Sequence, residues 1–74
     1  MVSTPEQPLP IRLNGQPYEV PPGTTVAGLV RRLELAQDRV AVEVDRRLVR
    51  RRDWDGRRLE ASTSVEIVQL VGGG

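Results

Sequence analysis

The apolar residues at the start of the chain fall into two short runs separated by a turn signal. Residues 11–13 alternate apolar and polar side chains, Asn-Gly follows at 14–15, and a second run covers 16–20. Asn-Gly between two alternating runs is a strong hairpin signal, because both residues tolerate positive φ. The pattern predicts an antiparallel hairpin. Pro17 has no N–H to donate, so we expect it at a strand start or on an unpaired edge.

A single helix is predicted after this hairpin. Across residues 26–33 apolar side chains recur at i, i+3, i+4 and i+7, which places them on one helix face. A hydroxyl from Thr24 or Thr25 is expected to cap the first turn. We expect the helix to end near residues 36–37. Gly28 either allows close approach to a sheet or is tolerated at a cost of about 1 kcal/mol relative to Ala.

The second half of the chain predicts further strands. The β-branched run 40–44 is typical of a strand, and 47–49 pairs back onto it after a two-residue turn. Residues 50–58 are polar and are expected to form a loop with one helical turn, in which Trp54 packs inward. The last strand is expected at 65–70. Its alternation places Val65 and Ile67 on one face and leaves apolar side chains on the other.

This order of elements predicts one α+β domain. One apolar helix stripe covers one face of a sheet. The expected architecture is an α+β roll with a four- to five-stranded mixed sheet and one main helix, which is compatible with the β-grasp arrangement. We expect a flexible leader at residues 1–10, the β-grasp domain at 11–71 and a flexible glycine tail at 72–74.

The amino-acid composition excludes several kinds of catalytic and metal-binding site. The 74 residues include no Cys and no His, so the chain has no thiolate nucleophile, and it lacks the commonest general base and metal ligand. We therefore expect no catalytic residue of its own, no metal site and no bound cofactor. The apolar stretches are too short to cross a membrane, and the N-terminus does not resemble a signal peptide. A cytoplasmic location, without a membrane partner, is the expectation.

The basic residues are all arginine, and they balance the acidic ones. Eleven Arg against 10 acidic residues give a net charge of +1, which does not favour nucleic acid as a partner. Many of the arginines lie between residues 46 and 58. Such a run is usually a solvated loop face. The alternative is a docking patch for an acidic partner, with Arg50 and Arg51 as candidate contacts, whose binding weakens with salt.

The C-terminus carries the most specific signal. Val71 ends an apolar strand, and Gly72, Gly73 and Gly74 follow it. Glycine has no Cβ, so Gly72 and Gly73 suit a stalk that threads a narrow channel. The reactive group is then the carboxylate of Gly74, which becomes an acyl donor once ATP adenylates it in a partner's active site. Exposed apolar residues next to such a tail indicate a partner surface, and the candidates are Val68, Leu70 and Val71.

Residues 11–74 resemble the ThiS family of sulfur carrier proteins. The resemblance rests on Asn-Gly at 14–15, the helix start at 24–26, the strand 40–44 and the ending Val-Gly-Gly-Gly. It implies a β-grasp, ubiquitin-like fold and adenylation of the C-terminus by a ThiF-type, E1-like enzyme that uses ATP. It also implies sulfur from a cysteine desulfurase or other persulfide donor, and delivery of that sulfur, as a thiocarboxylate, to thiazole synthase (ThiG).

Three other functions stay open at the level of the sequence. A MoaD-like small subunit of molybdopterin synthase would use the same tail. A ubiquitin-like modifier would join its C-terminus to lysines of other proteins. An interaction module would bind through its arginines and would not need the tail.

Overall fold

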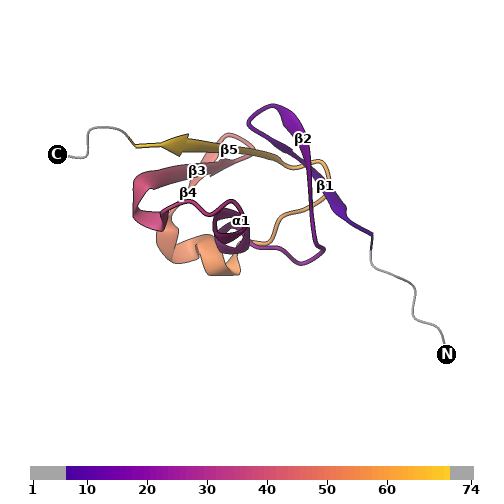
Figure 1. Ribbon diagram of the computed structural model, residues 1–74, viewed down its shortest axis with the longest axis horizontal. Coiled ribbons are helices and arrows are strands. Elements are labelled where there is room, and N and C mark those ends of the chain that lie inside the picture. Colours follow the sequence, from indigo (N-terminus) through magenta and orange to yellow (C-terminus); the bar gives the residue numbers. More distant parts are fainter. Residues whose placement is uncertain (1–6, 71–74) are drawn as a thin grey trace.

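The protein folds as a five-stranded mixed sheet with one α-helix across one face (Figure 1). The computed structural model describes residues 7–70. The strand order is β2-β1-β5-β3-β4, in which β1 and β5 are parallel and the other neighbours are antiparallel. The elements are β1 (Leu9–Leu13), β2 (Gln16–Val20), α1 (Val26–Arg32), η1 (Gln37–Arg39), β3 (Val40–Val44), β4 (Arg47–Val49), η2 (Arg51–Gly56) and β5 (Ser64–Gln69). This is the predicted β-grasp arrangement.

The first hairpin forms where Asn-Gly predicted it, with Asn14 and Gly15 both at positive φ. Pro17 lies on β2, an edge strand, as expected. The start of β1 differs from the prediction. β1 begins at Leu9, whose side chain packs against the core, and the Pro10 carbonyl accepts a hydrogen bond from the Ser62 N–H at 2.8 Å. These two residues therefore belong to the sheet and not to the leader.

The helix begins as predicted and ends early. The Thr25 hydroxyl accepts a hydrogen bond from the Gly28 N–H at 3.1 Å, which caps the first turn. The last helical residue is Arg32, about one turn before the expected end. Glu34 has a φ of 58°, and the Leu35 N–H donates to the Val30 carbonyl at 3.2 Å. This is the Schellman geometry, which normally has glycine at the position of Glu34, so the early end of the helix was not predicted.

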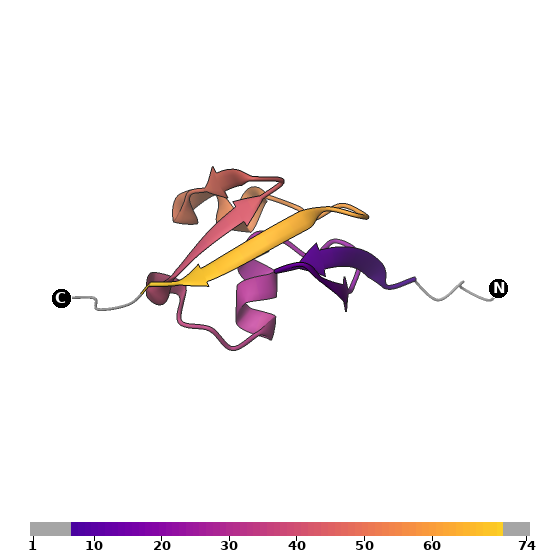
Figure 2. The ribbon, with the colours of Figure 1, turned by 90° about the horizontal axis from the view of Figure 1, so that it is seen from above.

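The core lies between α1 and the face of the sheet that it covers (Figure 2). Successive strand residues alternate between this covered face and an open face. Buried members from the sheet and the helix are Ile11, Val20, Val26, Ala27, Leu29, Val30, Val40, Val42, Val44 and Val65. Gly28 makes no close approach to the sheet, because a Cβ built there meets only threonine side-chain atoms, at 3.5 Å.

The segment between β4 and β5 closes one end of the core. η2 is the expected helical turn, and its Trp54 is buried. The indole Nε1–H donates to the Val49 carbonyl at 2.8 Å, so the polar edge of the ring is satisfied. Leu59 is buried as well, and its N–H donates to the Thr24 carbonyl at 2.9 Å. These contacts fix the arginine-rich segment against the domain.

Candidate functional site

The candidate site is the end of β5, from which the chain continues toward its C-terminus. β5 is the central strand, with β1 on one side and β3 on the other. Leu70, which directly follows β5 and is the last described residue, donates a hydrogen bond from its N–H to the Arg39 carbonyl at 2.7 Å. Val71, a candidate partner contact, and the predicted tail residues Gly72, Gly73 and Gly74 lie outside the described residues. The described part of the site is therefore the strand that leads to them.

A side chain extends the pairing of β5 where β1 has ended. β1 pairs with β5 only as far as Leu13 opposite Val65. Beyond it, the Asn14 main-chain N–H donates to the Val65 carbonyl at 2.8 Å. The Asn14 Oδ1 then accepts from the Ile67 N–H at 2.7 Å, and its Nδ2 donates to the Ile67 carbonyl at 3.3 Å. One amide side chain thus takes the place of a further strand residue and holds β5 close to its end.

The predicted alternation along β5 is present. Val65 is fully buried, while Val68 and Leu70 are 57% and 53% exposed. Val68 lies on the open face beside Ala41 of β3. These apolar side chains stand at the end of the strand that leads to the tail. Exposed apolar surface of this kind is typical of a contact site, and its use by a partner stays a prediction.

Two carboxylates lie side by side on the same open face, and sequence analysis missed them. Glu43 of β3 is directly opposite Glu66 of β5. Like charges in opposite positions of an antiparallel pair are destabilising. Neither residue stands out in the sequence, because only the register of β3 against β5 brings the two together. The open face therefore carries apolar side chains near the end of β5, and the two carboxylates lie at the level of Glu66, two residues before Val68 along that strand.

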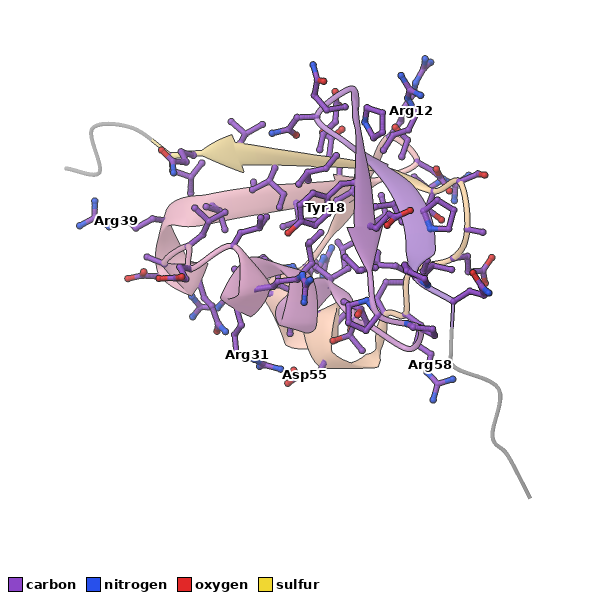
Figure 3. The ribbon with its side chains drawn as sticks, turned by 45° about the vertical axis from the view of Figure 1, so that its right-hand side comes forward. Arg12, Tyr18, Arg31, Arg39, Asp55 and Arg58 are labelled. Carbon is purple, nitrogen blue, oxygen red and sulfur yellow. The ribbon has the colours of Figure 1, made fainter. Side chains whose placement is uncertain are left out.

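The arginines are spread around the domain. Arg39 and Arg58 extend away from it (Figure 3). Arg50 directly follows β4 and Arg51 begins η2, and both are exposed. β4 and β5 are both antiparallel to β3, so they run in the same direction. The chain therefore leaves β4 toward the end of the sheet at which β5 ends.

The described residues offer little chemistry of their own. Within 7–70 no group of three or more acidic side chains is placed to hold a metal ion. None of the helices in that range is long and apolar enough to cross a membrane. What the arrangement provides is a firmly held strand end with an exposed apolar and charged surface beside it.

Comparisons with known proteins agree with this geometry. The ThiS family model matches residues 11–74. A thiazole synthase from Magnetococcus marinus is 38% identical over 64 residues, which are 86% of this chain but only 20% of that protein. The crystal structure of the thiamine biosynthesis protein ThiS from Geobacter metallireducens has a TM-score of 0.77 and 28% identity, over 89% of this chain and 100% of that one. This chain belongs to the ThiS family.

Proposed function

We propose that this protein is a sulfur carrier of thiamine biosynthesis that acts through the carboxylate of Gly74. The observation that carries the proposal is the family match, which runs through the glycines to residue 74. The resemblance to a ThiS protein and to one part of a thiazole synthase supports the same pathway. The anchored end of β5 supports it further, because a rigid base lets a short tail be presented in a defined direction.

The chemistry needs two steps on the terminal carboxylate. In the first, a carboxylate oxygen attacks the α-phosphorus of ATP and pyrophosphate leaves, which gives an acyl adenylate. In the second, a sulfide sulfur attacks the carbonyl carbon, the C–O bond to AMP breaks and a thiocarboxylate forms. ATP is a substrate of a ThiF-type enzyme, which supplies the catalytic groups. This chain is a protein co-substrate and contributes the acyl group.

The absence of Cys and His from the sequence fits this division of roles. Sulfur has no thiol to attach to in this chain, so it is carried on the terminal carbonyl carbon. Gly72 and Gly73 provide the narrow stalk that enters the partner's active site. A cysteine desulfurase or other persulfide donor supplies the sulfur. A thiol reductant releases it from the persulfide as sulfide and is itself oxidised to a disulfide, and thiazole synthase (ThiG) accepts the sulfur from the thiocarboxylate. The surfaces expected to meet these partners include Val68, Leu70 and Val71, with Arg50 and Arg51 at the same end of the sheet.

Intact-mass measurement tests the proposal. The full chain is incubated with a ThiF-type enzyme, ATP and sulfide. We expect a mass gain equal to the difference between one sulfur and one oxygen atom, located by fragmentation at Gly74. A chain that lacks Gly73 and Gly74 should keep its circular dichroism spectrum and gain no mass. An unchanged mass of the full chain, under conditions in which a known ThiS protein is converted, would contradict the proposal.

A second measurement separates the two sulfur-transfer pathways. The thiocarboxylate form is offered to thiazole synthase and, in parallel, to the large subunit of molybdopterin synthase. We expect loss of sulfur from the chain only with thiazole synthase. Transfer to the molybdopterin enzyme alone would assign the protein to the MoaD-like branch.

A further inference from the structure

The outer edge of β4 has unused hydrogen-bonding groups. Within residues 7–70, β4 pairs with β3 only. Val44 and Arg47 flank a two-residue turn and form a hydrogen-bonded pair, so the next pair, Glu43 and Leu48, is a non-hydrogen-bonded one. The N–H and C=O of Leu48 therefore point away from β3. They are available to an added strand.

An arginine-lined hollow lies beside this edge. It has a volume of about 470 Å³ and is bordered by residues of β4 and η2. Its lining residues include three arginines, Arg47, Arg52 and Arg57, and a single acidic residue, Asp53. The hydrogen bonds of the described residues include none from these three guanidinium groups. The hollow is thus positively charged, and its donors are free to bind an anionic group.

The two faces of this edge differ in chemistry. Arg47 lies opposite Val44 and Val49 opposite Val42, so both point to the face that α1 covers, where the hollow lies. Leu48 also borders the hollow, and the alternation of the strand turns its side chain toward the open face. This side chain is 64% exposed, more than either Val68 or Leu70. An added strand therefore meets an apolar side chain on one face and guanidinium groups on the other.

We propose that the β4 edge binds an extended acidic segment of a partner protein, which joins the sheet as an additional strand. The segment residue opposite Leu48 exchanges main-chain hydrogen bonds with it and covers its side chain with an apolar one. The residues before and after it point into the hollow, where their carboxylates meet the arginines. The recognised pattern is acidic–apolar–acidic. A small anion would use the guanidinium groups alone, and it would leave Leu48 uncovered and its main-chain groups unpaired.

This surface is distinct from the C-terminal residues on which the sulfur-carrier function depends. The proposal therefore stands or falls independently of that function. Arg50 and Arg51, the candidate contacts named within the arginine run 46–58, do not line the hollow. The three arginines that do line it belong to the same run, whose possible use as a docking patch the sequence already indicated. The fold of η2 beside β4 groups these three around the hollow.

A pair of peptides tests the proposed pattern. The isotope-labelled full chain is titrated, with NMR detection, with acetyl-Thr-Glu-Val-Glu-Thr-amide and with the composition-matched acetyl-Thr-Val-Glu-Glu-Thr-amide. We expect the first peptide to shift the amide resonance of Leu48 and to slow its exchange with solvent. The second, which cannot place both carboxylates on one face, should bind at least about fivefold more weakly. Equal binding of the two peptides, or binding of neither, would overturn the proposal.

Charge reversal at the hollow provides a second test of the proposal. Arg52→Glu combined with Arg57→Glu should weaken binding of the first peptide by about tenfold or more, because two charge-assisted contacts are lost. The matched control reverses Arg31 and Arg32, two exposed arginines in the last turn of α1. It has the same net charge and should bind as the wild type does. Equal weakening by both variants would mean non-specific attraction and overturn the proposal, as would inorganic phosphate binding at the hollow in place of the peptide.

Discussion

The side-chain amide of Asn14 forms hydrogen bonds to both main-chain polar groups of Ile67, a residue 53 positions further along the chain. Asn14 belongs to the first turn and Ile67 to the last strand, so this pair joins the two ends of the domain. Asn14 also has a φ of 51°. Asparagine tolerates that left-handed conformation better than most residues. One residue thus serves both the hairpin turn and the strand that leads to the tail.

Replacement of this amide should destabilise the fold. Asn14→Ala loses both hydrogen bonds to Ile67 and places a less suited residue at positive φ. We expect a loss of about 1–3 kcal/mol in the free energy of unfolding, measured by urea denaturation. Asn14→Gly is the matched control, because it keeps the turn geometry and removes only the amide. If the glycine variant were as stable as the wild type, the amide contacts would contribute nothing.

The end of α1 offers a stabilising substitution. Glu34 adopts a φ of 58° in the Schellman turn, where glycine is the favoured residue. Glu34→Gly should raise the free energy of unfolding by up to about 1 kcal/mol. The same substitution at Asp38, which is exposed and has no positive φ, should not stabilise the protein. Thermal and urea unfolding of the two variants give the comparison.

Gly28 allows a second stabilising change. It lies inside α1, and an added Cβ meets only ordinary contacts with Thr24 and Thr25 at 3.5 Å. Gly28→Ala should stabilise the protein by about 0.5–1 kcal/mol through improved helix propensity. A lower midpoint of urea denaturation would instead indicate that the methyl group disturbs the N-cap.

The facing carboxylates on the open face should make stability depend on salt. Glu43→Gln and Glu66→Gln each remove the repulsion between the pair, so we expect each to stabilise the fold by about 0.2–1 kcal/mol at low ionic strength. Added salt should reduce this gain, because it screens the exposed charges of the wild type. The double variant should be little more stable than either single one. Additive effects would mean that the two side chains do not interact.

The exposed apolar residues near the tail should affect partners and not folding. Val68→Asp and Leu70→Asp change side chains that are more than half exposed, so we expect their unfolding midpoints to stay close to that of the wild type. Binding to a ThiF-type enzyme or to thiazole synthase, followed by calorimetry, should weaken by about tenfold or more, as expected for a buried apolar contact. Unchanged affinity for both enzymes would place the interface elsewhere.

Local sequence signals predicted most of the fold. Asn-Gly, the i, i+3, i+4, i+7 stripe and the β-branched run at 40–44 each depend on near neighbours, and the corresponding elements are present. The early end of α1 was not predictable, because Glu34 occupies a position that glycine normally marks. The start of β1 at Leu9 was missed, since its pairing is with Val20, on the return strand of the hairpin.

From the sequence, the exposed residues of the site could be predicted only where the alternation of side chains along a strand determines which face they occupy. Val68 and Leu70 follow from the period of a strand. The arginine run 46–58 stands out in the sequence, but which of its members line the hollow depends on the fold of η2 beside β4. The pairs Asn14–Ile67 and Glu43–Glu66 depend on contacts between distant segments. Such contacts require the register of the sheet, which the sequence pattern does not supply.

The central position of β5 also affects how the domain responds to force. β1 and β5 run parallel, and the chain enters the sheet and leaves it at opposite ends of the molecule (Figure 1). Tension applied between the two termini therefore acts along the strands and loads their hydrogen bonds together, in shear. A partner that draws the C-terminus into its active site would meet a mechanically resistant anchor, and the domain would stay folded while its end is held.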